Sequence, residues 1–194
     1  MEKKFSNLKD NFKRLFIAID FLEETKSKLY AFQEEIKRSI WGDIKWVERE
    51  NFHLTLKFLG EVSIDLIEDI KEVMVEVSNY VNPFYISLKG FGAFPSFDSP
   101  RVLWIGIEEG IKEIEMLFGL LEKRLVKKGF EKERKAFSPH LTLGRVKSRN
   151  FKISREYSFS EEKIFVEEIT LFESKLTQQG PIYTPIFRIK LGKK

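Results

Sequence analysis

The stretch FHLTLKFL, residues 52–59, returns in altered form as FSPHLTLGR, residues 137–145. The chain contains only two histidines, His53 and His140, and each of them begins a copy of the tetrapeptide HLTL. If residues were drawn independently, a given histidine would be followed by Leu-Thr-Leu with a chance of about 10⁻⁴ to 10⁻³. The repeat therefore indicates a duplication and not a coincidence.

The two copies lie 87 positions apart, which is far longer than the periods of solenoid repeats. This spacing predicts a single duplication of a half-domain and two half-copies related by a pseudo-two-fold axis. No segment of low-complexity composition separates the copies. We therefore expect one bilobed domain and not two independent ones.

Each HLTL copy has the alternation of a half-buried strand. Side chains in a strand point to opposite faces in turn, so His53 and Thr55 share one face while the two leucines of the copy share the other. The same alternation places His140 and Thr142 together. Two such strands facing each other across a pseudo-two-fold axis would bring two imidazoles and two hydroxyls into one cleft.

Hydrophobic periodicity predicts an alternation of strands and amphipathic helices along the rest of the chain. Neighbouring strands are connected locally, which favours antiparallel pairing and an α+β fold of two antiparallel sheets with outer helices. Gly60 is expected to end the strand of the first copy, and the glycines and prolines of residues 90–100 predict an irregular loop. The strands are expected at 14–20, 44–47, 52–59, 84–90, 101–107, 139–146, 164–173 and 182–189, and the helices at 22–39, 63–82 and 111–128.

The composition restricts the class of protein. The 194 residues are 42% hydrophobic and 33% charged, which suits a compact globular unit. The chain has no cysteine, so disulfides, thiolate metal sites and a cysteine nucleophile are excluded. Residues 1–13 form a charged extension ahead of a single domain at 14–194, and no apolar run approaches the ~20 residues of a membrane span. We expect a monomer in a reducing cytoplasm.

The net charge of +4 arises from 34 basic and 30 acidic residues that are mixed along the chain. Such mixing does not indicate a protein that tracks along duplex nucleic acid. A small nucleotide or the end of an RNA remains compatible with it, because one phosphate in a pocket needs only a few local cations and donors.

The residues of the repeat suit acid/base chemistry on a phosphodiester. A neutral imidazole can take a proton from the nucleophile while an imidazolium gives one to the leaving oxygen, and both forms are accessible near a pKa of about 6.5. The hydroxyls of Thr55 and Thr142 can donate to phosphate oxygens as charge develops. No HExxH motif and no cluster of His and carboxylate residues is present, so neither a metal nor a cofactor is expected. The alternation does not determine which imidazole is the acid.

Phe16 is a candidate base-stacking residue in the strand RLFIAID, residues 14–20. Its branched neighbours form one apolar face of that strand, which leaves Phe16 on the other face, where an aromatic ring can stack on a nucleobase. The alternative is that Phe16 packs under a loop.

Arg145 is a second candidate contact. Strict alternation would turn this side chain away from the cleft and into the core, as expected for the equivalent Phe58, and an unpaired guanidinium is costly to bury. A bulge at Gly144 would return Arg145 to the cleft, near the phosphate or the base. The alternative is that the strand ends at Gly144 and leaves Arg145 in solvent.

The chain resembles the 2H phosphoesterase superfamily, which is named for two H-x-T/S motifs, and within it the RNA 2',3'-cyclic phosphodiesterases, formerly called 2'-5' RNA ligases. The resemblance extends from about Arg14 to Ile189. It is carried by RLFIAID (14–20), WVERENFHLTLKFLG (46–60), FPSFDSPRVLWIGI (94–107), FSPHLTLGR (137–145) and LFESKLTQQGPIYTPI (171–186).

The resemblance implies a bilobed fold of two antiparallel sheets and the metal-independent hydrolysis of a terminal 2',3'-cyclic phosphate to a 2'-phosphomonoester. By position, His53 would be the proton donor and His140 the proton acceptor, with Thr55 and Thr142 binding the phosphate. The expected partners are RNA ends or small cyclic nucleotides, without a membrane. Two alternatives stay open: 2'-5' RNA ligation in the same site, with a 5'-hydroxyl in place of water, and a noncatalytic protein that binds nucleotides or RNA ends.

Overall fold

The computed structural model describes residues 11–148, 150–153, 156–178 and 180–192. Its elements follow one another along the chain as strands, α-helices and two 3₁₀ helices, η2 and η3. They are β1 (Phe12–Asp20), α2 (Glu23–Lys37), β2 (Ile40–Trp41), β3 (Ile44–Trp46), η2 (Arg49–Asn51), β4 (His53–Ser63), η3 (Ile64–Leu66), α3 (Ile67–Ser78), β5 (Phe84–Phe94), β6 (Val102–Ile107), α4 (Ile111–Lys127), β7 (Leu141–Val146), β8 (Lys152–Ile153), β9 (Glu162–Val166), β10 (Glu168–Leu176) and β11 (Pro181–Lys190).

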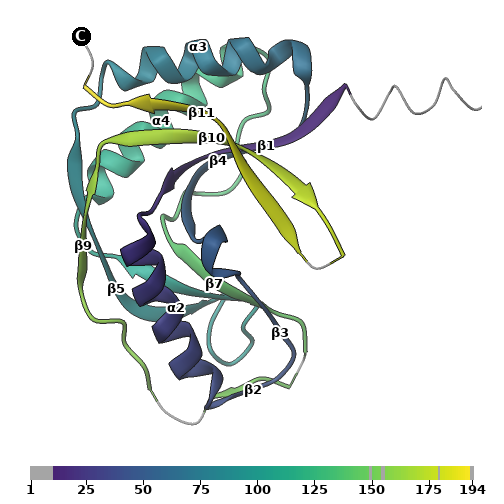
Figure 1. Ribbon diagram of the computed structural model, residues 1–194, viewed down its shortest axis with the longest axis vertical. Helices are drawn as coiled ribbons and strands as arrows, with labels where there is room; N and C mark the ends of the chain where they lie inside the picture. Colours follow the sequence, from purple (N-terminus) through teal and green to yellow (C-terminus); the bar gives the residue numbers. More distant parts are fainter. Residues whose placement is uncertain (1–10, 149, 154–155, 179, 193–194) are drawn as a thin grey trace, which may run out of the picture.

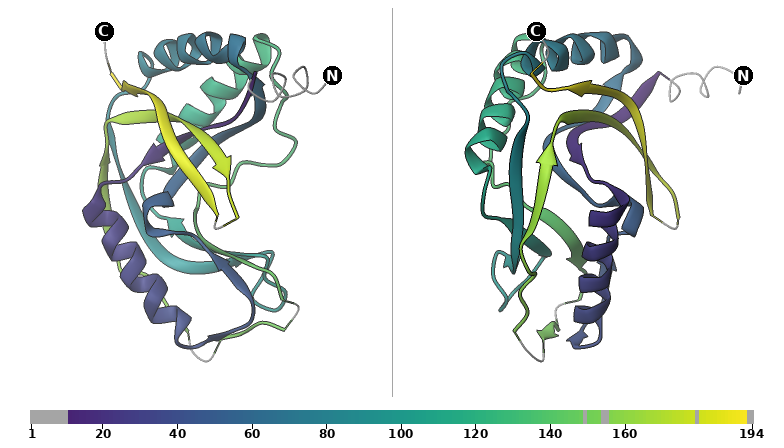
Figure 2. Two further views of the ribbon diagram at one scale, coloured as in Figure 1. Left: turned by 45° about the vertical axis from the view of Figure 1, so that its right-hand side comes forward. Right: turned by 60° about the vertical axis from the view of Figure 1, so that its left-hand side comes forward.

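Two antiparallel sheets form the two lobes, as the sequence predicted (Figure 1). The upper sheet has the order β11-β10-β1-β4 and the lower sheet the order β3-β7-β6-β5-β9. One copy of HLTL therefore lies in each sheet, in β4 and in β7. The hairpin of β10 and β11 extends away from the upper sheet beside the lower one (Figures 1 and 2).

The lobes do not correspond to the two halves of the chain. The upper sheet takes β1 and β4 from the first half and β10 and β11 from the second, and the lower sheet is mixed in the same way. The helices are also exchanged between the two lobes. Helix α4, from the second half of the chain, packs against β4 of the upper sheet. Helix α2, from the first half, packs on the lower sheet, where the ring centroids of Phe32 and of Phe91 in β5 are 5.9 Å apart. The duplicated halves are thus interleaved, which explains why they share one core.

That core runs continuously through both lobes. It includes the leucines of both HLTL copies, all of them at most 2% exposed. A second, smaller apolar cluster of Phe16, Ala18 and Phe172 lies on the opposite face of the upper sheet. The apolar backing and polar front of each HLTL strand are therefore present as predicted.

The expected positions of the elements are confirmed except at glycines, at the N-terminus and at residues 164–173, where the single expected strand is two strands, β9 in the lower sheet and β10 in the upper one. Strand β1 starts at Phe12, inside the expected extension, because residues 12 and 13 pair with β4. Strand β4 continues through Gly60 to Ser63, and β5 continues through Gly90 to Phe94, so neither glycine ends a strand. Both take positive φ angles beside a shift in register, where glycine is tolerated without strain. The short ladder of β2 and β8 was not predicted.

No helix within these described ranges is both long enough and apolar enough to cross a membrane.

A buried ion pair joins β4 to α4. The ammonium of Lys57 lies 2.7 Å from the carboxylate of Glu122, and the two side chains are 4% and 11% exposed. Lys57 also donates to the carbonyl of Glu131 at 3.0 Å, and Glu122 accepts from the backbone N–H of Glu133. The pair therefore fixes the start of the segment that leads from α4 to His140.

Replacing Lys57 by methionine should lower the free energy of unfolding by about 3–5 kcal/mol, because it leaves the Glu122 carboxylate buried without its partner. Urea unfolding followed by circular dichroism measures this. Lys89→Met is the matched control, since it removes the same charge from the exposed pair with Glu108 and should change the midpoint far less. Equal shifts for the two variants would contradict a structural role for the buried pair.

Candidate active site

Each HLTL strand contains a bulge directly after its His-x-Thr segment. In the upper sheet Thr55 pairs with Ala18 and Lys57 with Ile17, so Leu56 is an extra residue. In the lower sheet Thr142 pairs with Trp104 and Gly144 with Leu103, so Leu143 is the extra residue. The two copies thus share one irregularity at equivalent positions.

The bulge reverses the alternation beyond it. Arg145 pairs with Val102, on the same face as Thr142, so the predicted return of Arg145 to the cleft face is confirmed. Phe58 pairs with Phe16 and is 44% exposed, so the expectation that Phe58 belongs to the core is wrong. The first copy makes its bulge without a glycine, and a glycine is therefore not what causes it.

Gly144 has a different role. A Cβ atom at this position would lie 2.9 Å from the Ile44 side chain and 3.0 Å from the Trp46 ring, both on the neighbouring strand β3. Only glycine allows β3 to pack this closely against β7. Behind the bulge, the Leu143 carbonyl accepts hydrogen bonds from the Val47 backbone N–H and the Gln33 side chain, at 2.9 and 3.0 Å.

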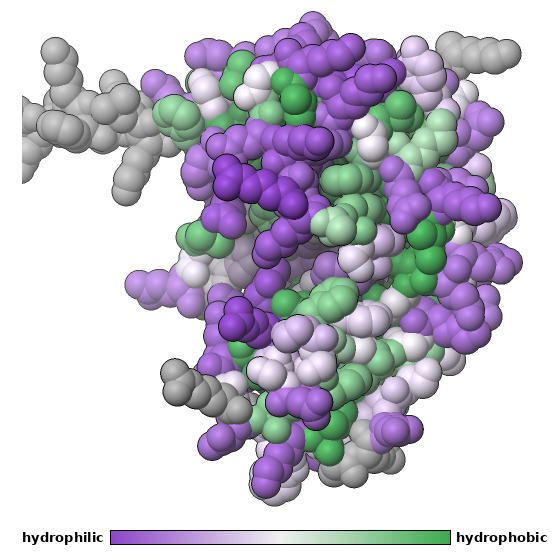
Figure 3. Space-filling model, turned by 180° about the vertical axis from the view of Figure 1, so that it is seen from behind, coloured by the Kyte–Doolittle hydropathy of each residue, from purple (hydrophilic) through white to green (hydrophobic). Residues whose placement is uncertain are grey.

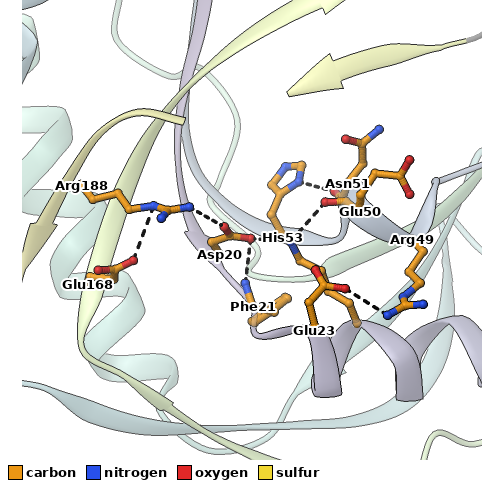
Figure 4. Close-up of polar contacts among 10 residues, drawn as sticks. Asp20, Phe21, Glu23, Arg49, Glu50, Asn51, His53, Glu168 and Arg188 are labelled. Atoms are coloured by element: carbon orange, nitrogen blue, oxygen red, sulfur yellow. Dashed lines mark hydrogen bonds and ion pairs between the residues drawn. The ribbon is translucent and has the colours of Figure 1, made fainter. Parts of the chain in front are cut away.

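The two imidazoles are held in the same way. His53 Nδ1 lies 2.7 Å from the carbonyl oxygen of Asn51, and His140 Nδ1 lies 2.7 Å from that of Ser138, in each case two residues earlier in the chain. A carbonyl only accepts, so Nδ1 carries a proton in both rings and Nε2 carries the lone pair of the neutral form. His53 Nε2 lies 2.9 Å from the Thr55 hydroxyl. Figure 4 shows the bond from His53 toward Asn51.

Aromatic rings surround both histidines. Phe16 lies 4.8 Å and Tyr183 5.2 Å from the His53 ring, and Phe94 lies 5.1 Å from the His140 ring. Phe16 is on the cleft side of β1, as the alternation predicted, but it is fully buried among its neighbours. Its ring therefore has no exposed face for a nucleobase, and it packs against the His53 imidazole.

A small ionic network lies beside His53. Asp20, at the end of β1, contacts Lys26 at 2.8 Å and Arg188 at 3.5 Å, and it accepts from the backbone N–H of Phe21 at 2.9 Å. Arg188 also approaches Glu168 at 3.7 Å, as Figure 4 shows. Asp20 is thus an acidic group beside His53, with which it pairs across β1 and β4.

The surroundings lower the pKa of both imidazoles. The pKa of His53 is lowered to about 4, mainly by burial. The hydrogen bond to the Asn51 carbonyl and the charge of Asp20 act in the opposite direction, and the charge of Lys26 lowers the pKa further. Burial also lowers the pKa of His140, against the Ser138 carbonyl, and the charge of Arg145 lowers it further. Charges of both signs thus act on His53, where Asp20 favours an imidazolium and Lys26 disfavours one, while Arg145 disfavours an imidazolium at His140.

Tyr183 is a site residue that the sequence did not reveal. It reaches His53 from the β10–β11 hairpin. Burial raises the pKa of Tyr183, and the charges of Arg145 and Arg14 oppose this rise only in part. Tyr183 therefore contacts His53 and is affected by the charge of an arginine of the second copy. No feature of the sequence singles out Tyr183, because many strand residues share its place in the alternation of faces.

A sequence model described as LigT like phosphoesterase matches residues 19–104 and, a second time, residues 105–183. The chain belongs to this family. The double match agrees with the duplication, and each matched copy contains one HLTL strand.

Other members of the LigT-like family resemble the chain along nearly its whole length. The RNA 2',3'-cyclic phosphodiesterase of Archaeoglobus fulgidus is 42% identical over 175 residues, which cover 88% of this chain and 96% of that one. A solved structure from Thermus thermophilus superposes with a TM-score of 0.77 at 29% identity, covering 92% of this chain and 98% of the other. The structure of E. coli LigT complexed with 3'-AMP gives a TM-score of 0.74 at 26% identity, covering 94% and 99%.

Among the residues that the structure describes, no group of three or more histidine, cysteine, aspartate or glutamate side chains could hold a metal ion.

The two histidines make the site accessible to nitrogen NMR, because every imidazole signal comes from it. We expect both neutral rings to be protonated at Nδ1, since each Nδ1 donates to a carbonyl. On titration His53 should show a pKa near 4 and His140 a pKa below 6.5, both lowered mainly by burial. The spectrum of His53→Ala assigns the signals. A Nε2-protonated tautomer at either ring, or two pKa values near 6.5, would contradict this geometry.

Proposed function

We propose that this chain hydrolyses the terminal 2',3'-cyclic phosphate of RNA to a 2'-phosphomonoester, with His53 and His140 as general acid and general base. The observation that carries the proposal is the duplicated imidazole geometry, in which two His-x-Thr segments on the contacting strands β4 and β7 hold Nδ1 in the same way and leave Nε2 for proton transfer. The phosphodiesterase of Archaeoglobus fulgidus, similar over 96% of its length, supports the choice of substrate.

In the proposed reaction a water molecule attacks phosphorus while Nε2 of His140 removes its proton. The bond from phosphorus to the 3'-oxygen breaks, and Nε2 of the protonated His53 gives that oxygen its proton. Each Nδ1–H bond to a carbonyl keeps its ring oriented and stabilises the imidazolium form. The products are a 3'-hydroxyl and a 2'-phosphate, and one further proton exchange restores the starting protonation states.

The assignment of His53 as acid and His140 as base follows the positions of the family's two motifs. Burial lowers the pKa of both rings in the free protein. At His53 Asp20 favours the protonated form and Lys26 the neutral form, while at His140 Arg145 favours the neutral form. The charged phosphate raises the pKa of both rings on binding, which makes an imidazolium accessible at neutral pH.

Three further side chains are proposed to bind the phosphate. Thr55 and Thr142 share the cleft face with the histidines and can donate hydroxyl hydrogen bonds to the phosphate oxygens. Arg145 follows Thr142 on that face and can contribute a guanidinium to the same charge. Phe16 is proposed to hold the His53 ring in place and not to contact the base.

The same groups could carry 2'-5' ligation if a 5'-hydroxyl replaced water, which the assay below distinguishes by its product. The monomeric state and the cytoplasmic location expected from the sequence stay predictions.

The purified chain should convert an RNA octanucleotide ending in a 2',3'-cyclic phosphate to the 2'-phosphate, as phosphorus NMR of the product shows, and EDTA should not reduce the rate. His53→Ala and His140→Ala should each lower kcat by about 10² or more with the melting temperature unchanged, because each removes one proton-transfer group. A noncatalytic binding protein would give no turnover. If a variant lost its fold while its folded fraction kept a normal kcat, the acid/base role of that histidine would be excluded. Strict dependence on a divalent ion would exclude the metal-free mechanism.

The pH dependence follows from the lowered pKa values. Activity requires one protonated and one neutral imidazole, and in the free enzyme both pKa values lie below 6.5, with that of His53 at about 4. We expect a bell-shaped profile of kcat/KM with its maximum below pH 6.5 and a fall of about tenfold per pH unit on the alkaline side. The kcat profile should lie at higher pH, because bound phosphate raises both pKa values. A kcat/KM maximum above pH 8 would contradict paired imidazole catalysis.

A further inference from the structure

A groove of about 420 Å³ lies beside the cleft, between the second half of β4 and the segment that follows α4. This volume is in the range of about 300–1,000 Å³ that is typical of small-molecule sites. On one side the groove is lined by residues 57–60 and on the other by residues 130–135. The left panel of Figure 2 shows the segment after α4 running along the outside of the upper sheet.

The wall formed by residues 130–135 carries three cations against the two carboxylates of Glu131 and Glu133. Lys132, Arg134 and Lys135 are exposed, and within the described parts of the chain none of them forms an ion pair. The Glu133 carboxylate is turned back to accept the backbone N–H groups of Arg134 and Lys135, at 3.1 and 3.2 Å. On the face seen in Figure 3, hydrophilic side chains border a recess left of the centre.

The buried pair of Lys57 and Glu122 fixes this wall. Lys57 donates to the Glu131 carbonyl at 3.0 Å, and Glu122 accepts from the Glu133 N–H, so that two alternate residues of the wall are tied to the fold. An ordered wall loses little conformational entropy when a ligand binds. Because the charge of Lys57 is already paired, the free positive charge of the groove belongs to the exposed residues of the wall.

The groove is connected to the proposed catalytic centre by stacked rings. Phe58, on the groove's other side, is 44% exposed and stacks on Phe16 at 5.5 Å, and Phe16 lies 4.8 Å from His53. The guanidinium of Arg14 lies 5.8 Å from the Phe58 ring. An exposed aromatic ring beside unpaired cations is the arrangement that binds single-stranded nucleic acid, by base stacking and phosphate contacts.

We propose that this groove binds the RNA chain on the 5' side of the nucleotide that carries the cyclic phosphate, with a base against Phe58 and phosphates along the basic wall. The inference rests on the proposed function. A 2',3'-cyclic phosphate ends the RNA at its 3' side, so the remaining chain can leave the cleft only toward its 5' side. The groove makes the enzyme selective for oligonucleotides over mononucleotides.

The test compares two substrates, adenosine 2',3'-cyclic phosphate and an octanucleotide with the same terminus. The double variant Arg134→Ala/Lys135→Ala should lower kcat/KM for the octanucleotide roughly tenfold at low salt and leave the mononucleotide within twofold. Its salt dependence for the octanucleotide should be weaker by roughly 1.4 in slope, for two lost phosphate contacts. Lys112→Ala/Lys152→Ala removes the same charge at exposed positions outside the groove and is the matched control.

Phe58→Leu tests the stacking separately, since leucine still covers Phe16. It should raise KM for the octanucleotide roughly fivefold or more and leave the mononucleotide unchanged. An octanucleotide rate that none of the variants lowers beyond the control, or equal losses on both substrates, would overturn the subsite.

The proposed function itself fails if the wild-type chain converts neither substrate. The groove is then judged by the fluorescence anisotropy of a labelled octanucleotide ending in a 2'-phosphate. Weaker binding to Arg134→Ala/Lys135→Ala than to the control supports the groove as an RNA site without catalysis. Equal binding to the two variants overturns it.

Discussion

The site depends on one backbone constraint, the two-residue period of a strand, and on its interruption at the same place in both lobes. The period brings each histidine and its threonine to the cleft face and sends the leucines into the core. A single extra residue, Leu56 or Leu143, then reverses the alternation, so that the residue five positions after each histidine also faces the cleft. Without these bulges Phe58 and Arg145 would be directed into the core, where a guanidinium has no partner.

The core and the cleft make opposite demands on the same strands. Buried leucines fix the position of each strand, so that the strand can hold its imidazole partly buried. Burial removes the water that would stabilise the charged form of the ring, and this lowers its pKa. The carbonyl bond to each Nδ1 compensates in part and selects one tautomer. Burial thus favours the neutral form of both rings, and in the proposed mechanism the charge of a bound phosphate raises their pKa values again.

Features that repeat with a period could be predicted from the sequence, and features set by distant contacts could not. The HLTL strands, the face that each histidine shares with its threonine and the antiparallel lobes follow from alternation and duplication. The interleaving of the lobes does not, because nothing in β10 indicates that its partner is β1. The bulge was predicted in the second copy from Gly144 and missed in the first, since no glycine marks Leu56. Phe16 was placed on the correct face, yet its burial depends on rings from other strands, including Phe172 and Tyr183.

The divergence between the copies has a physical reason in the substrate. A pair of identical His-x-Thr strands related by a two-fold axis would accept a cyclic phosphate in two orientations, with either oxygen as leaving group. A nucleotide lacks that symmetry, so productive binding requires the two sides of the cleft to differ. They differ in the charges beside the rings, where Asp20 and Lys26 act on His53 and Arg145 acts on His140. In the proposed mechanism duplication supplies two proton-transfer groups, and divergence beside the two rings assigns each of them to one oxygen.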